Sequence, residues 1–135
     1  MSDYTMSETC RAPNADVLAH VRAALAGAGF GIITEIDLQA TLAAKLGVEV
    51  PAQVILGACN PTFAHRAITI EPSVAALLPC NVVVRSVDGE TTRVEAFDPA
   101  AMAKIAGESD ELEAVVGDVR HQLRLALDTV AEALA

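Results

Sequence analysis

Hydrophobic and polar positions alternate along some segments of the chain and recur at helical spacing along others. Alternation with a period of two predicts strands, and apolar residues three and four apart predict helices with one buried side. The first pattern predicts strands at Tyr4–Cys10, Phe30–Ile36, Val54–Cys59, Asn81–Val87 and Thr91–Phe97. The second pattern predicts helices at about Ala15–Ala28 and at Leu38–Leu46, a third that begins at Pro61 and stops near Pro72, and a last long helix from about Ser109.

Capping residues mark several of these boundaries. Asn14, Asp37 and Asn60 stand where a helix begins, and their side chains can accept a hydrogen bond from a free backbone N–H of the first turn. Gly29 and Gly47 stand where a helix ends, in the place that glycine prefers because it tolerates a left-handed backbone. These signals sharpen the predicted ends of the first three helices.

Strands and helices mix without a regular βαβ repeat. This order favours one domain over residues 1–135, with an α+β fold, a mostly antiparallel sheet and two long helices on one face. Aromatic residues make up only 3% of the chain. The core must therefore be built from alanine, valine, leucine and isoleucine. The other face of the sheet is free to pack against a second copy, so a homodimer is among the expectations.

The charge balance excludes two classes of partner. Nine Lys and Arg residues stand against eighteen Asp and Glu residues, which gives a net charge of −9. We expect no nucleic-acid partner and no anionic membrane surface, since both are bound through cationic side chains. The sequence has neither a stretch long and apolar enough to span a bilayer nor the apolar core of a signal peptide. A cytoplasmic location is the expectation, where cysteines normally stay reduced.

The dipeptide Cys-Asn occurs twice, as Cys59-Asn60 and Cys80-Asn81. The first pair ends a predicted strand just before a helix, and the second begins the next predicted strand. We expect both cysteines at the same end of the sheet, close enough to share a ligand. The helix that follows Cys59 would favour its thiolate. The opposing interpretation is that both cysteines are buried small hydrophobes and that Asn60 is only a cap.

Two further groups of residues are weaker candidates. Glu35 and Asp37 are two residues apart, so on one strand they would face the same side and could act as an acid/base pair. The simpler interpretation makes Asp37 a helix cap and pairs Glu35 with a cation such as Lys45. His65 could join the two cysteines in a metal site, but this spacing matches no known zinc motif and a fourth ligand is not evident.

A set of local motifs resembles the domain-of-unknown-function 302 family. The motifs are Gly29-Phe30-Gly31 with Thr34-Glu35-Ile36-Asp37, Thr41-Leu42 with Lys45-Leu46-Gly47, Ile55 to Pro61, Leu78 to Val82, and Asp98 to Met102. The resemblance implies an α+β fold of the TATA-binding-protein type, without implying DNA binding. It also supports a site at Cys59, Asn60, Cys80 and Asn81, with Glu35 in second rank. It supplies no reaction, and Cys10 lies outside the pattern.

Three functions remain open from the sequence. The leading hypothesis is a small binding or accessory domain that holds a small molecule, a metal or a cofactor near the two Cys-Asn pairs. The second hypothesis is a thiol-based redox protein that uses Cys59 and Cys80. The third hypothesis is a structural or interaction module with inert cysteines. No catalytic residue is assigned, and the identity of a metal or cofactor is left open.

Overall fold

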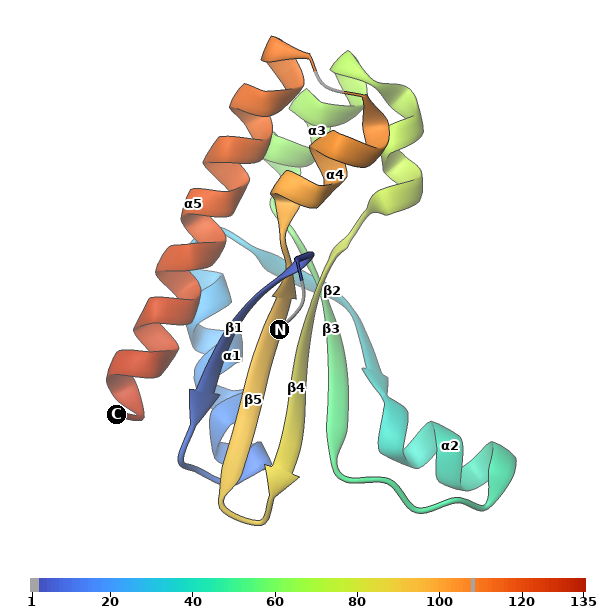
Figure 1. Ribbon diagram of the computed structural model, residues 1–135, viewed down its shortest axis with the longest axis vertical. Coiled ribbons are helices and arrows are strands. Elements are labelled where there is room, and N and C mark those ends of the chain that lie inside the picture. The colour runs from blue at the N-terminus through green and yellow to red at the C-terminus, as the bar shows by residue number, and fades with distance from the viewer. Residues whose placement is uncertain (1–2, 108) are drawn as a thin grey trace.

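The computed structural model describes residues 3–107 and 109–135 and combines strands with helices (Figure 1). The strands are β1 Thr5–Cys10, β2 Gly31–Asp37, β3 Gln53–Cys59, β4 Cys80–Asp88 and β5 Thr91–Phe97. The helices are α1 Asn14–Gly27, α2 Leu38–Leu46, α3 Pro61–Ile70, α4 Pro99–Ala106 and α5 Asp110–Ala133, with a 3-10 helix, η1, at Pro72–Leu77. Each predicted strand is confirmed to within one residue at either end.

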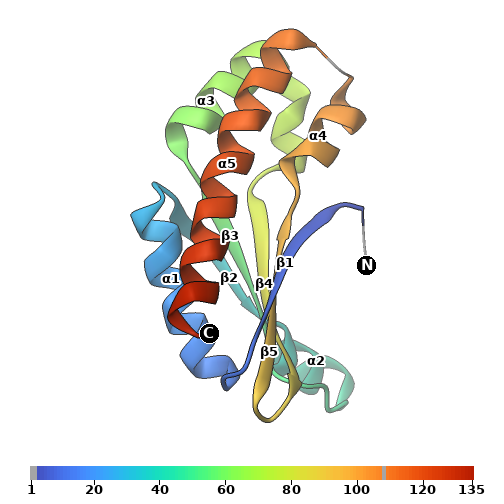
Figure 2. The same ribbon diagram turned by 60° about the vertical axis from the view of Figure 1, so that its left-hand side comes forward.

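The five strands form one antiparallel sheet in the order β1-β5-β4-β3-β2. Helices α1 and α5 pack against each other and against one face, which we call the covered face (Figure 2). Val82, Val84, Val94 and Ala96 point to this face and are buried. The residues between them point to the opposite face, which lies away from α1 and α5 and which we call the open face. The predicted α+β fold with an antiparallel sheet is therefore confirmed.

Two hydrophobic clusters lie one above the other along α5. The sheet cluster joins α1, the covered face and the C-terminal half of α5, including Leu123 and Leu127. The cap cluster joins α3, η1, α4 and the N-terminal half of α5, including Leu112 and Val115. Val119 packs against both clusters. The 24 residues of α5 thus link the sheet to the helical cap that stands beyond its upper end in Figure 1.

Two boundary predictions need correction. Asn14 is the first residue of α1 and forms no cap. Its side-chain Nδ2 instead donates a hydrogen bond to the carbonyl of Val84 at 3.2 Å, which is a contact with the sheet. Helix α4 was missing from the prediction, although Asp98 caps it by accepting from the Ala100 amide at 2.9 Å. Asp98-Pro99 repeats the signal of Asn60-Pro61, but the helix after it has only eight residues.

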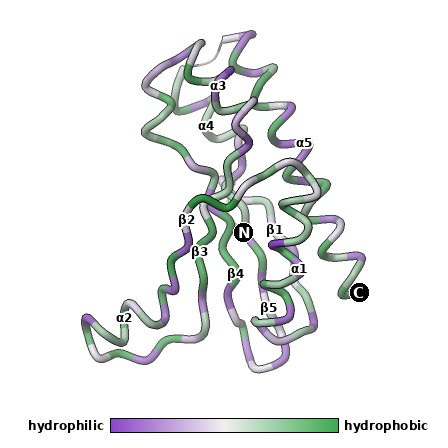
Figure 3. The backbone as a smooth tube through the Cα atoms, turned by 180° about the vertical axis from the view of Figure 1, so that it is seen from behind, coloured by the Kyte–Doolittle hydropathy of each residue, from purple (hydrophilic) through white to green (hydrophobic). Residues whose placement is uncertain are grey.

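Helix α2 forms an arm at one side of the sheet, set apart from the two clusters (Figure 3). None of its residues is buried, and Leu46 near its end is 69% exposed. As predicted, Asp37 caps this helix and Gly47 ends it in a left-handed conformation with φ 67°. Within residues 3–107 and 109–135, no helix is long and apolar enough to cross a membrane.

Candidate functional site

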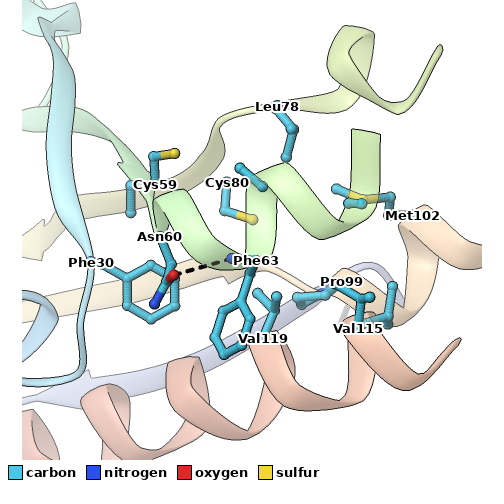
Figure 4. A pocket seen from close by; sticks show the side chains of 14 residues that line it. Phe30, Cys59, Asn60, Phe63, Leu78, Cys80, Pro99, Met102, Val115 and Val119 are labelled. Atoms are coloured by element: carbon cyan, nitrogen blue, oxygen red, sulfur yellow. Dashed lines mark hydrogen bonds between the residues drawn. The ribbon is translucent and has the colours of Figure 1, made fainter. Parts of the chain in front are cut away.

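A small cavity lies at the boundary between the two clusters, where β3 and β4 meet α3, α4 and α5 (Figure 4). We call it the seam cavity. Its volume is about 40 Å³, and its walls are apolar. The lining residues come from both clusters and are Phe30, Ala58, Cys59, Asn60, Phe63, Ala64, Ala67, Leu78, Cys80, Pro99, Met102, Val115, Val116 and Val119. Three of the five predicted site residues, Cys59, Asn60 and Cys80, belong to this wall.

Asn60 fixes the direction in which the chain leaves the sheet. Its Oδ1 accepts hydrogen bonds from the backbone amides of Thr62 at 3.1 Å and Phe63 at 3.2 Å, which confirms the predicted cap. The cap starts α3 directly after β3 and places the ring of Phe63 in the cavity wall (Figure 4). Gly29 lies against the same amide, because a Cβ at Gly29 would stand 3.0 Å from the Asn60 Nδ2. Asn60 therefore has a structural role at this site.

Cys80 is buried at the beginning of β4, where it pairs with Ala58 across the ladder. Its side chain points to the covered face, and its sulfur is directed toward the Phe63 side of the cavity (Figure 4). Burial, with a smaller contribution from the nearby Cys59, raises the pKa of the Cys80 thiol to about 11. The thiol is therefore protonated near neutral pH and adds a weakly polar, polarisable group to an apolar wall.

Cys59 follows Ala58 on β3, and successive side chains of a strand point to opposite faces. It is half-buried, and its side chain and that of Cys80 extend in different directions (Figure 4). Both thiols are free, as is the buried thiol of Cys10. The structure thus brings the two cysteines to neighbouring strand ends, as expected, but directs their side chains to different sides.

Asn81 lies on the open face, away from the seam cavity. It pairs with Gly57 in the β3–β4 ladder, and its side chain is exposed. It lines a separate groove on that face. The separation of Cys80 from Asn81 follows from strand alternation, since adjacent residues cannot face the same side of a sheet. The second Cys-Asn pair therefore contributes one residue to each face.

Glu35 also lies outside the cavity wall. Its carboxylate forms an ion pair with Arg22 of α1, where the sequence suggested Lys45 as the partner. The Oδ1 of Asp37 accepts a hydrogen bond from the Ala40 amide at 2.9 Å, so the two carboxylates have separate roles. The Arg22 guanidinium reaches Glu35 through the packing of α1 beside β2, a tertiary contact that local spacing does not encode.

The described residues do not form a metal centre. Among residues 3–107 and 109–135, no three or more His, Cys, Asp or Glu side chains gather closely enough to hold a metal ion. His65 is exposed on α3 and is not part of the cavity wall. The sequence analysis missed the wall residues of α4 and α5, such as Met102 and Val115. Val115 was signalled only by the apolar stripe of the last helix, which any packed helix shows, and Met102 only by its place in the Asp98 to Met102 motif.

Comparison with known proteins adds the family and supports the fold. A search of curated proteins found no match. The crystal structure of an uncharacterized conserved protein DUF302 from Bacillus stearothermophilus superposes with a TM-score of 0.87 at 23% identity, over 96% of this chain and 99% of that one. This likeness is one of fold. The sequence pattern of the family described as "Domain of unknown function DUF302" matches residues 6–130, and the chain therefore belongs to this family.

Proposed function

We propose that this domain binds a small apolar molecule in the seam cavity. The observation that carries the proposal is an apolar space at the meeting point of two clusters, bordered by Ala58, Ala64 and Ala67. Protein interiors are normally close-packed, and an empty apolar cavity tends to stay dry and to accept apolar guests. Larger side chains at the alanine positions would fill the space, so the small residues keep it open.

The volume of the cavity limits the size of a ligand that can enter without a movement of the helices. A volume of about 40 Å³ holds a few water-sized groups, which suits a small gas or the end of a hydrocarbon chain. A larger guest requires α3 and α4 to move away from the sheet. The cavity lies where the two clusters meet and α5 packs in both, so the N-terminal half of α5 has to move with α3 and α4 if the cap cluster is to stay packed.

The geometry favours binding over thiol redox chemistry. A redox pair needs one thiol that ionises readily and a second thiol that it can reach. Burial raises the pKa of Cys80 to about 11, which opposes ionisation. The side chains of Cys59 and Cys80 extend in different directions from the ends of β3 and β4 (Figure 4). Cys80 is better suited to serve as a contact for an apolar guest.

Xenon, a small apolar gas, probes the cavity at its present volume, and benzene, which is apolar and larger, probes it when α3 and α4 move away from the sheet. We expect either probe to shift the amide NMR signals of Phe63, Cys80 and Val119, which border the cavity. Ala64→Val adds two methyl groups at the cavity wall and should weaken binding at least tenfold. Ala114→Val places the same side chain on the exposed side of α5 and controls for helix propensity. Shifts that are absent from the cavity, or that persist unchanged in Ala64→Val, would contradict the proposal.

A further inference from the structure

A second concave site lies on the open face, separate from the seam cavity. This open-face groove has a volume of about 510 Å³, within the range of small-molecule sites. Residues of β1, β3, β4 and β5 line it together with the segment from Ala76 to Pro79. Its walls combine apolar side chains, such as Leu78 and Phe97, with the side chains of Gln53 and Arg85. This mixture of apolar surface and a few polar groups is typical of a ligand site.

Arg85 presents an unused donor edge in the groove. Its Nε and Nη2 bind the same oxygen, Oε1 of Glu95, at 2.9 and 2.8 Å. The Nη1 atom has no partner within residues 3–107 and 109–135, so the outer Nη1–Nη2 edge is available. Two parallel N–H groups on one edge match the two oxygens of a carboxylate. The side chain is 39% exposed, so a ligand can reach it.

The open face has a local charge that differs from that of the whole chain. Arg85 of β4 pairs directly with Arg93 of β5, and Arg93 approaches the same Glu95 oxygen as Arg85 does, at 3.8 Å. Two cations and one anion leave this cluster with an excess of one positive charge, whereas the chain carries −9. A small anion is therefore favoured here and repelled by most of the remaining surface.

The polar groups of the groove are spaced along β4. Gln53 lies directly opposite Arg85, and Asn81 precedes Arg85 by four residues, about 13 Å along a strand. Val83 lies between them on the same face. In the part of the chain that the structure describes, neither the Gln53 nor the Asn81 amide makes a side-chain hydrogen bond. One polar end, an apolar middle and a second polar end are thus laid out in a line.

We propose that the open-face groove binds a small organic carboxylate with an apolar body. The carboxylate lies on the outer edge of Arg85 beside Gln53, and the apolar body extends over Val83 toward Asn81. The groove and the seam cavity share Leu78 in their walls, but they lie on opposite faces of the sheet, so the two ligands occupy different spaces. A ligand of the apolar seam cavity needs no charge, whereas a ligand of the groove needs a negative charge to bind Arg85.

Octanoate is the probe, and 1-octanol is the matched compound without a carboxylate. We expect octanoate to bind the intact chain at least tenfold more tightly than 1-octanol, with amide shifts at Val83 and Arg85. Gln53→Glu keeps the side-chain shape and places a competing carboxylate opposite Arg85, and Arg85→Gln removes the cation. Each should weaken octanoate binding at least tenfold. Arg22→Gln is the control, because Arg22 is similarly exposed at 41% and also pairs with a glutamate.

Two results would overturn the proposal. The first is equal binding of octanoate and 1-octanol, or octanoate binding that Gln53→Glu leaves unchanged. Gln53→Glu is nearly isosteric, so the variant should fold. Circular dichroism checks this, so that a loss of structure is not mistaken for a loss of binding. The second is a dimer in sedimentation equilibrium that Gln53→Glu or Val83→Glu dissociates, since a second copy would then be the occupant of the open face.

Discussion

At the scale of single residues, Cys80 has surroundings that oppose ionisation. The thiol is buried, and its pKa is raised from 9.0 to about 11 in the folded protein. In the unfolded chain the same thiol titrates near 9.0. The folded state therefore holds the proton more tightly. This stabilisation is complete below pH 9 and is lost as the pH rises toward 11.

The expected consequence is a pH-dependent free energy of unfolding to which Cys80 contributes, beside the Cys10 thiol, whose pKa burial also raises. Between pH 8 and pH 10 the wild-type chain should lose about 1.4 kcal/mol more than Cys80→Ala, because only the unfolded thiol ionises over the pH unit above 9 and one such unit corresponds to roughly that amount. Urea titrations at both pH values measure the difference. Cys59→Ala should retain the pH dependence of the wild type. A Cys80→Ala variant with the same pH dependence as the wild type would show that another group is responsible.

Local signals identified the role of Asn60 and Asp37 correctly, because a cap is decided by two or three neighbouring residues. The same reasoning could not join the two Cys-Asn pairs into one site. Cys80 and Asn81 are neighbours in sequence, yet strand alternation sends their side chains to opposite faces. Glu35 forms its ion pair with Arg22 because α1 packs beside β2, which is a tertiary contact. Residues whose roles depend on tertiary contacts were thus beyond the reach of spacing arguments.

At the scale of elements, a close approach of three strands depends on Gly57 in β3. Thr34 of β2 and Asn81 of β4 pair with it on either side. A Cβ built at Gly57 would stand 2.0 Å from the Thr34 Oγ1 and 2.8 Å from the Pro79 Cγ. Such distances are impossible for real atoms, so a side chain here would push the strand ends apart. Pro79 belongs to the wall of the open-face groove, which links this packing to the proposed site.

We expect Gly57→Ala to lower the free energy of unfolding by about 1–3 kcal/mol, the usual cost of overpacking a filled site. Gly117→Ala is the matched control, because Gly117 lies within α5 and a Cβ there would meet nothing within 4 Å. That change should stabilise the chain by about 0.5–1 kcal/mol through helix propensity. Urea denaturation measures both variants. Equal stability of Gly57→Ala and the wild type would mean that the strands separate without cost.

The periodic pattern was sufficient for long elements and insufficient for short ones. The stripe of apolar residues over α5 and the alternation over β5 each extend for several repeats, and both elements were predicted closely. Helix α4 offers two turns, too few for a clear period, and only its Asp98-Pro99 start signals it. The order of the strands in the sheet depends on long-range pairing, which no local pattern contains.

At the scale of the whole molecule, α5 connects two hydrophobic clusters that share few other elements. Its N-terminal half packs in the cap cluster and its C-terminal half in the sheet cluster. Val119 contacts both, and Gly117 lies near the junction. An unbroken helix transmits loss of structure in one cluster to the other. We therefore expect the wild-type chain to unfold in one cooperative transition.

Gly117→Pro tests this coupling. Proline within a helix removes one hydrogen bond and clashes with the preceding turn, at a cost of about 3 kcal/mol. The break would fall between the parts of α5 that serve the two clusters, so the cap should unfold at lower urea than the sheet. Amide exchange of Leu112 and Leu123, which are buried in the cap cluster and the sheet cluster, reports the two regions separately.

In the wild type both amides should exchange with the same free energy of opening, and in Gly117→Pro that free energy should fall further for Leu112 than for Leu123. Gly117→Ala, which keeps the helix intact, should preserve the single transition. If both amides lose protection equally in Gly117→Pro, the clusters are joined by contacts other than α5.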